Sequence, residues 1–263
     1  MAKVTINDLF EVKSRGEKFA CLTAYDATFS DLISRSGVEV ILVGDSLGSV
    51  IQGHKTTLQV TVNNMAYHTA CVTKIEPQSL VITDLPFMSY PNSAEAIKTA
   101  SAMMRNGAEM VKVEGGHWLS SIISDLVERG IPVCGHLGLT PQSFHMLGGY
   151  KVQGRTESDA ETILSDALTI QEAGASLLVL ECVPETLASK ISAKLKIPVI
   201  GIGAGPNTDG QVLVLHDMLG LTTNSPGFSK NFLKDADSVA SAIKNFLNSV
   251  KNGEFPEKSN WYK

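Results

Sequence analysis

The stretch GVEVILVGD (residues 37–45) begins with a glycine, continues as a short apolar run and has an acid at its end. The same pattern returns in GAEMVKVEG (107–115) and GASLLVLEC (174–182), and the first glycines of the three stretches are 70 and 67 residues apart. Each interval has room for two strand–helix units. A glycine that ends a helix just before an apolar strand is typical of a repeated βα fold with a parallel sheet.

Eight apolar runs of strand length occur along the chain, at residues 19–26, 40–45, 80–87, 110–116, 132–139, 177–183, 198–205 and 212–219. Amphipathic segments between them predict helices over residues 93–108, 118–130, 157–175 and 184–196. Eight strands with this repetition favour a (β/α)₈ barrel over an open doubly wound sheet. The weak point is PNTDGQ (206–211), because this connection between the last two predicted strands is too short for a helix. No linker divides the chain, so residues 1–263 are predicted to form a single domain.

Composition excludes several classes of partner. The formal net charge is −5, without the basic surface that nucleic acid or an anionic membrane would select. The N-terminal segment lacks the hydrophobic region of a signal peptide, and no apolar run approaches the length of a membrane span. The four cysteines are scattered without C-x-x-C spacing, as expected for reduced thiols. We therefore expect a soluble, cytoplasmic protein.

Charged residues stand at the ends of four of the predicted strands. Because side chains alternate along a strand, residues two apart share a face. Three faces have apolar residues followed by an acid, in the sets Ile41, Val43, Asp45; Leu80, Ile82, Asp84; and Leu177, Val179, Glu181. The fourth face is Met110, Lys112, Glu114, and Cys182 is expected on the helix side of its strand. Barrel active sites are built from C-terminal strand ends, so the acids and Lys112 are predicted to meet at one mouth.

Clustered carboxylates repel one another unless a cation is present. Lys112 offers one positive charge against four acids, and oxygen ligands suit Mg²⁺ better than zinc. The alternative is that each acid caps the helix that follows it. GHLGLTPQS (135–143) places His136 at the mouth, where it could be catalytic or structural, and Ser46 could bind a ligand carboxylate or cap a helix. The loop GGYKVQGR (148–155), with Tyr150, is expected to be solvated surface.

Eight motifs, in order along the chain, resemble those of the ketopantoate hydroxymethyltransferase family: TAYD, LVGDSLG, TDLPFMSY, MVKVEGG, VCGHLGLTPQS, GGYKVQGR, LLVLECVP and IPVIGIGAG. The resemblance covers residues 5 to about 250, nearly the whole chain. It implies a phosphoenolpyruvate/pyruvate-type (β/α)₈ barrel of pantothenate biosynthesis, cytoplasmic and usually a homodecamer. It further implies one-carbon transfer from 5,10-methylenetetrahydrofolate to 3-methyl-2-oxobutanoate, giving 2-dehydropantoate, with one Mg²⁺ bound per subunit.

The same resemblance implies a role for each strand-end residue. The residues that match the family's metal ligands are Asp45 of GDS, Asp84 of TDLPF and Glu114 of VEGG. Those that match substrate-binding residues are Asp45, Ser46, Asp84 and Lys112, and we add His136 to them as a further candidate. Glu181 of LLVLEC matches the proton acceptor that would form an enolate.

Other activities remain compatible with these residues. A Mg²⁺-dependent aldolase or lyase of the same barrel type would use an enolate without folate. Lys112 on an inward strand face would also suit a Schiff-base aldolase. A non-catalytic barrel that binds a keto acid is a third possibility, although it would not need an acid at so many strand ends.

Overall fold

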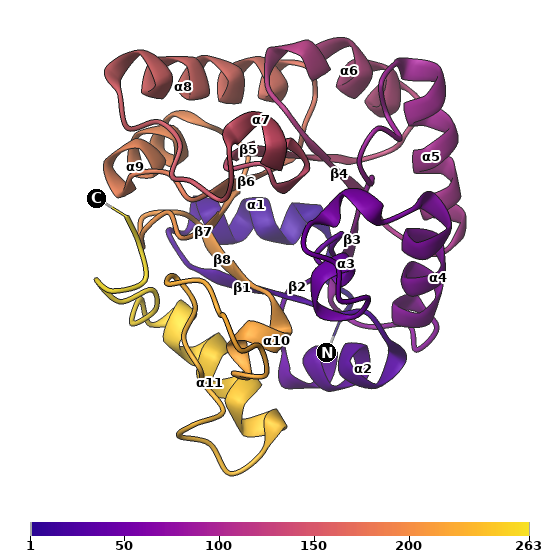
Figure 1. Ribbon diagram of the computed structural model, residues 1–263. Helices are drawn as coiled ribbons and strands as arrows, with labels where there is room; N and C mark the ends of the chain where they lie inside the picture. The colour runs from indigo at the N-terminus through magenta and orange to yellow at the C-terminus, as the bar shows by residue number, and fades with distance from the viewer. Residues whose placement is uncertain (1, 263) are drawn as a thin grey trace.

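Eight parallel strands form a closed barrel, which confirms the predicted (β/α)₈ architecture (Figure 1). The computed structural model describes residues 2–262, so the two ends of the predicted domain, residues 1 and 263, lie outside the described residues. The strands, in chain order, are β1 (Phe19–Thr23), β2 (Val40–Val43), β3 (Leu80–Asp84), β4 (Met110–Glu114), β5 (Val133–Gly138), β6 (Leu177–Glu181), β7 (Val199–Ile202) and β8 (Gly210–Leu213). Each strand pairs with the next, and β8 pairs with β1, so the sheet has no free edge.

Helices surround the strands in an outer ring. The longer ones are α2 (Ala27–Ser36), α4 (Val62–Thr73), α5 (Ser93–Arg105), α6 (Ser120–Glu128), α8 (Glu157–Glu172), α9 (Glu185–Lys194) and α11 (Val239–Lys251). Figure 1 shows short helices inside this ring, near the strand ends: α3 (Leu47–Val50), α7 (Phe144–Leu147) and α10 (Leu215–Met218). The 3₁₀ turns are η1 (Thr57–Gln59), η2 (His117–Leu119) and η3 (Pro141–Ser143). The helices predicted over 93–108, 118–130, 157–175 and 184–196 are confirmed as α5, α6, α8 and α9.

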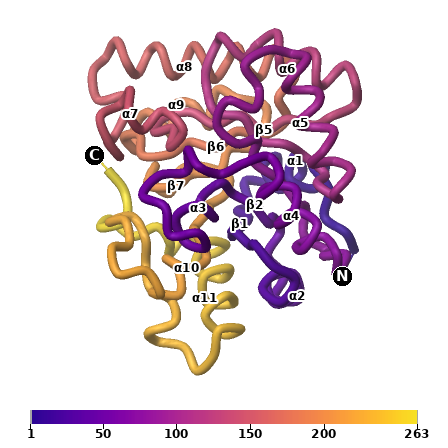
Figure 2. The backbone as a smooth tube through the Cα atoms, turned by 45° about the vertical axis from the view of Figure 1, so that its right-hand side comes forward, coloured from indigo at the N-terminus to yellow at the C-terminus, as the bar shows by residue number. Residues whose placement is uncertain are grey.

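Local sequence explains where the outer helices begin and end. At the start of α2 the Asp26 side chain accepts a hydrogen bond from the Phe29 N–H, and at its end Gly37 has a φ of 92°, a left-handed conformation that favours glycine. This is the glycine that opens the repeated stretch 37–45. Figure 2 shows α11 and the segment before it on the side of the barrel opposite α6 and α8. Across residues 2–262, no helix combines the length and apolar character needed to cross a membrane.

Helix α1 (Ile6–Ser14) covers the N-terminal end of the barrel. Its Lys13 Nζ lies 2.7 Å from Asp209 Oδ2 and 2.9 Å from the Ser192 carbonyl oxygen. Asp209 precedes β8, and the same Oδ2 accepts a hydrogen bond of 2.8 Å from the Val199 N–H at the start of β7. Lys13 and Asp209 thus serve to hold this end of the barrel together. The C-terminal mouth is the end at which barrel active sites are built.

The β7–β8 connection closes the barrel without a helix, as its short length required. Gln211 Nε2 donates to the Gly205 carbonyl oxygen at 3.0 Å and to Thr208 Oγ1 at 2.8 Å, which holds the loop against β8. Strand β8 itself begins and ends earlier than the predicted run 212–219. That prediction was wrong at its C-terminal end, because the chain leaves the sheet after Leu213 and forms α10.

The register determines which side chains point into the barrel. Asp84 is the Cα partner of Lys112, and Glu114 is the partner of His136, so these four residues share the inward face. The pairing of β5 with β6 places Glu181 on the same face. The predicted alternation is therefore confirmed for the third, fourth and sixth strands.

The predicted inward face of β2 was wrong. Leu42 pairs with Ile82 and lines the mouth, so Ile41 and Val43 point outward to the helices. Asp45 still reaches the mouth because β2 ends at Val43 and the chain turns before Asp45. Beyond the end of a strand, the two-residue alternation no longer applies.

Candidate active site

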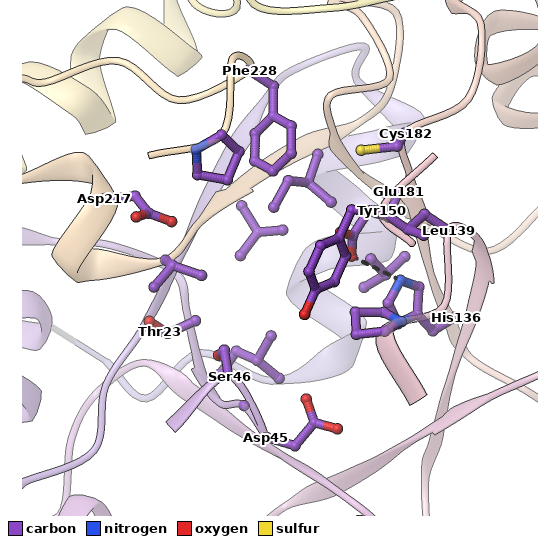
Figure 3. A pocket seen from close by; sticks show the side chains of 18 of the residues that line it. Thr23, Asp45, Ser46, His136, Leu139, Tyr150, Glu181, Cys182, Asp217 and Phe228 are labelled. Atoms are coloured by element: carbon purple, nitrogen blue, oxygen red, sulfur yellow. Dashed lines mark ion pairs between the residues drawn. The ribbon is translucent and has the colours of Figure 1, made fainter. Parts of the chain in front are cut away.

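A cavity of about 410 Å³ opens at the C-terminal mouth of the barrel (Figure 3). This volume is within the range of roughly 300–1,000 Å³ that is typical of small-molecule sites. The cavity is lined by every residue singled out from the sequence: Asp45, Ser46, Asp84, Lys112, Glu114, His136 and Glu181. Residues from β3, β4, β5, β6 and the turn after β2 thus meet in one place although they are spread over more than half of the chain.

Lys112 lies at the centre of the charged groups. Its Nζ is 3.0 Å from Asp84 Oδ1 and 4.0 Å from Glu114 Oε1, and its side chain is only 4% exposed. Burial by itself lowers the pKa of this ammonium group, but the carboxylates of Asp84, Glu114 and Asp45 outweigh burial and raise it. Lys112 is therefore held as a cation.

His136 connects the lysine to Glu181. Its Nδ1 lies 3.1 Å from Lys112 Nζ and 3.3 Å from Glu114 Oε1, and its Nε2 lies 3.2 Å from Glu181 Oε2. Burial and the Lys112 charge lower the His136 pKa, but Glu114 and Glu181 outweigh them and raise it to about 9. His136 lies between the Lys112 ammonium on its Nδ1 side and the Glu181 carboxylate on its Nε2 side, and so helps to position Glu181, whose side chain is 14% exposed.

Asp45 and Ser46 are placed by the tight turn that follows β2. A Cβ at Gly44 would lie 2.7 Å from Ser46 Oγ, so a larger residue at this position would displace the serine hydroxyl. The Asp45 N–H donates to Asp84 Oδ2 at 2.9 Å, and Ser46 Oγ lies 2.9 Å from Tyr25 Oη. Burial, together with the charges of Glu114 and Asp84, raises the pKa of Asp45 well above its usual range.

Helix capping does not explain the acids. The residues at the N-caps of the helices that follow β2, β3, β4 and β6 are Ser46, Asn92, Gly116 and Pro184. Ser46 makes no side-chain cap hydrogen bond, so capping does not explain this serine either. None of the four acids is therefore the N-cap of the helix that follows its strand.

The carboxylates fit a hard cation whose remaining ligands come from substrate and water. Asp84 Oδ1 and Glu114 Oε1 are buried and, within residues 2–262, have no hydrogen-bond partner of good geometry. Over the same residues, no group of three or more His, Cys, Asp or Glu side chains has the geometry of a preformed metal site. Mg²⁺ usually takes one or two carboxylates and keeps other positions for water or substrate oxygens. The residues present suit that arrangement better than a closed structural site.

The sequence analysis missed several residues on the loops around the mouth. Gln142, in η3, donates through Nε2 to Asp45 Oδ2 at 2.9 Å, and Tyr90 Oη donates to Gln142 Oε1 at 2.6 Å. Asp217, in α10, also lines the cavity, with its carboxylate turned inward across from Tyr150 (Figure 3). The only sequence signal for Gln142 is its place shortly after a strand end, in the TPQS part of 135–143.

One prediction about side-chain direction was incomplete and one was wrong. Tyr150 is 54% exposed, as expected for a solvated loop, but it also lines the cavity, and burial of the rest of the side chain raises the pKa of its phenol. Cys182, expected on the helix side, lines the cavity too, because it follows β6 with a positive φ of 47°. Both lie beyond a strand, where alternation gives no guidance.

The fold and the cavity together define a class, the (β/α)₈ barrels with a small-molecule cavity at the C-terminal mouth. The chain is similar in structure to phosphonopyruvate hydrolase, with a TM-score of 0.63, 13% sequence identity and 84% of each chain covered. It is also similar to phosphoenolpyruvate phosphomutase from Streptomyces platensis subsp. rosaceus, with a TM-score of 0.62 and 14% identity over 95% of this chain and 93% of that one. At these identities the similarity establishes the fold alone.

Sequence comparison then identifies the family. The family model for ketopantoate hydroxymethyltransferase matches residues 3–258. A 3-methyl-2-oxobutanoate hydroxymethyltransferase of Shewanella sp. (strain MR-4) is 52% identical over the full length of both chains, and one of Marinobacter nauticus is 54% identical over 99% of each. The chain belongs to the ketopantoate hydroxymethyltransferase family, as the motifs in its sequence had indicated.

Proposed function

We propose that the protein transfers a hydroxymethyl group from 5,10-methylenetetrahydrofolate to 3-methyl-2-oxobutanoate, giving 2-dehydropantoate for pantothenate biosynthesis. The observation that carries the proposal is the cluster of buried carboxylates around Lys112, with Glu181 beside it, in a chain about half identical to relatives named for this activity. From the family resemblance we also propose that the protein works in the cytoplasm as a homo-oligomer.

In this proposal Asp45, Asp84 and Glu114 hold one Mg²⁺ ion. Their summed negative charge exceeds the single positive charge of Lys112, and the hard oxygen donors match this ion. When bound with the keto and carboxylate oxygens of the substrate, Mg²⁺ would supply a Lewis acid that stabilises enolate charge. The ammonium of Lys112 and the hydroxyl of Ser46 then bind substrate oxygens directly.

Glu181 is the proposed base. It removes the proton from C3 of 3-methyl-2-oxobutanoate, and the electron pair of that C–H bond passes into the enolate. C3 then forms a bond to the methylene carbon of the donor, both carbon–nitrogen bonds of that methylene break, and water supplies the hydroxyl oxygen. The two donor nitrogens take up the proton that Glu181 removed and one proton from water, which releases tetrahydrofolate. His136, 3.2 Å from Glu181 Oε2, holds the base in place and binds substrate from the same wall.

The state of Lys112 argues against a Schiff-base aldolase. A lysine that attacks a carbonyl must be a neutral amine, and such lysines have lowered pKa values. The three carboxylates around Lys112 raise its pKa instead. Lys112 therefore suits charge stabilisation rather than covalent catalysis.

The donor is proposed to occupy the part of the cavity that is lined by Asp217 and Phe228, which come from α10 and the segment after it. A buried carboxylate and an aromatic ring in one cavity suit a flat heterocycle that carries N–H donors. Tyr150 closes the opposite side (Figure 3).

Two assays test the proposed function. Purified protein with both substrates should form 2-dehydropantoate, lose activity in excess EDTA and regain it with added Mg²⁺. Without folate, it should still exchange the C3 proton of 3-methyl-2-oxobutanoate with deuterium oxide, because proton removal precedes the donor. Activity that persists in EDTA would reject the cation, and C3 exchange without any product would favour an enolate enzyme that does not use folate.

A further inference from the structure

Gln142 is a buried amide that touches two of the three proposed cation ligands. Its residue is 7% exposed, and its Nε2 donates to Asp45 Oδ2 at 2.9 Å. Its backbone N–H donates to Glu114 Oε2 at 3.0 Å. One residue of η3 thus holds carboxylates that come from two different strand ends.

The remaining hydrogen bonds determine the orientation of the amide. Nε2 also donates to the Leu85 carbonyl oxygen at 2.9 Å, and Oε1 accepts from Tyr90 Oη at 2.6 Å. A reversed amide would place Oε1 against the Asp45 carboxylate and the Leu85 carbonyl, both of which are acceptors. Tyr90 Oη in turn accepts from the Glu114 N–H at 3.2 Å, so the network joins the ends of β2, β3 and β4.

The three carboxylates share one pattern. An N–H group holds one oxygen of each: Gln142 holds Asp45 Oδ2 and Glu114 Oε2, and the Asp45 N–H holds Asp84 Oδ2. The other oxygens of Asp84 and Glu114 are buried and, among the described residues, make no hydrogen bond of good geometry; they face the basic groups Lys112 Nζ, at 3.0 Å, and His136 Nδ1, at 3.3 Å. Because amide donors are neutral, they orient the carboxylates without cancelling the negative charge that a cation requires.

We propose that Gln142 is a positioning residue that presets Asp45 and Glu114 for the cation and the keto acid. The inference rests on the proposed function, since it requires a cation at these carboxylates. Loss of the side-chain amide would leave Asp45 Oδ2 buried without its donor and free the carboxylate to rotate. Both effects weaken binding at the other oxygen.

The test compares Gln142→Met with Gln211→Met. Each variant replaces a buried amide by an apolar side chain of similar length, but Gln211, 2% exposed, bonds Gly205 and Thr208 in the β7–β8 loop. Mn²⁺ binding in the presence of 3-methyl-2-oxobutanoate is measured by electron paramagnetic resonance. Gln142→Met should raise the Mn²⁺ dissociation constant by about 10- to 100-fold, whereas Gln211→Met should leave it unchanged.

A double-mutant comparison separates positioning from general loosening of the barrel. In an Asp45→Asn background, Gln142→Met should raise the Mn²⁺ dissociation constant by less than a further factor of about three, because the residue that Gln142 positions has already been changed. If Gln142→Met does not fold, Tyr90→Phe replaces it, since this variant removes the hydroxyl that donates to Gln142 Oε1 and accepts from the Glu114 N–H. We expect Tyr90→Phe to weaken Mn²⁺ binding about 3- to 10-fold.

The outcomes distinguish this inference from the function on which it rests. Wild-type Mn²⁺ affinity in Gln142→Met, or in Tyr90→Phe where that variant is used, overturns the positioning role and leaves the proposed function intact. An equal loss in Gln211→Met overturns it as well, because the effect would then be structural. Wild-type protein that binds no Mn²⁺ rejects the proposed function and the inference together.

Discussion

The two sides of the mouth are lined by side chains of different character, one side charged and the other apolar. The ends of β2 to β5 contribute Asp45, Asp84, Lys112, Glu114 and His136, each of them buried. The ends of β7 and β8 and the segments that follow contribute the apolar lining residues Ile202, Val212, Val214 and Phe228. Figure 3 shows Asp45 and Ser46 across the cavity from Phe228.

This difference assigns the two ends of a small keto acid to the two sides. The keto and carboxylate oxygens need charge and hydrogen-bond donors, which the first side holds in excess. The branched alkyl end needs apolar contact, which the second side offers. Glu181 stands at the boundary between the two sides, since β6 lies between β5 and β7. The carbon that loses its proton in the proposed reaction also lies between the oxygens and the methyl groups.

The largest effect is expected for Glu181→Gln, which removes the base at the boundary and leaves both sides intact. The glutamine has the same size and can occupy the same place next to His136, so keto acid and cation should bind as in the wild type. The rate of C3 deuterium exchange without folate, followed by proton NMR, should fall on the order of 10²- to 10⁴-fold.

The matched control for the base is Glu185→Gln. Glu185 follows in the same chain connection, but its Oε1 accepts from Asn207 Nδ2 at 2.5 Å and it does not line the cavity. This variant should exchange C3 at the wild-type rate. Wild-type exchange in Glu181→Gln would instead mean that Glu181 is not the base, and His136 would become the next candidate.

Asp84→Asn should weaken the charged side as a whole. The change removes a carboxylate from the proposed cation site and also the partner 3.0 Å from Lys112 Nζ. We expect Mg²⁺ and keto acid affinity to fall together, roughly 10²-fold each, because the substrate is held through the ion and the lysine. Isothermal titration with each ligand measures the two losses.

Asp209→Asn is the control for this prediction, because it breaks a similar contact at the other end of the barrel. Asp209 Oδ2 lies 2.7 Å from Lys13 Nζ. This variant should lower the melting temperature without changing either ligand affinity. Loss of keto acid affinity alone in Asp84→Asn would show that the residue binds substrate and not the cation.

Sequence reasoning predicted the side-chain direction correctly for the cavity residues that lie within regular strands. Asp84, Lys112, Glu114 and Glu181 lie on their strands, and the two-residue alternation alone places them on the inward face. Barrel closure was predicted as well, and only the helix-free β7–β8 connection had made it uncertain. Within a regular strand, the spacing of residues in the sequence determines which way their side chains point.

The parts that could not be predicted lie where the backbone is irregular. Asp45 was assigned to the mouth through an inward face that β2 does not have, and the turn at Gly44 is what places it there. Gln142 and Asp217 lie on short helices, whose position depends on packing against several strand ends at once. Cys182 has a positive φ that no spacing reveals.

Asp217→Asn should affect only the donor. Asp217 is the acid on the apolar side, and burial raises its pKa although the Thr222 and Ser225 hydroxyls and the His216 charge oppose this shift. The substitution replaces a carboxylate oxygen, a charged hydrogen-bond acceptor, by an amide N–H, which is a donor. This change should raise the KM for 5,10-methylenetetrahydrofolate about 10- to 100-fold. C3 exchange measured without folate should remain at the wild-type rate, and a fall in that exchange would place Asp217 in the keto acid site instead.

Val212→Ala should give the smallest effect and tests the apolar side by itself. Val212 is 4% exposed, lines the cavity and carries no polar group, so the change shortens an apolar contact without altering any charge. Removing two methyl groups that contact the alkyl end should raise the KM for 3-methyl-2-oxobutanoate about 3- to 10-fold. The KM for pyruvate, which lacks those methyl groups, should change less, and Mg²⁺ affinity should not change.

Leu213→Val is the control, since Leu213 is the next residue of β8 and pairs with Leu22, which points outward from the barrel. An equal rise in KM for both keto acids in Val212→Ala would mean that the alkyl group does not lie against β8.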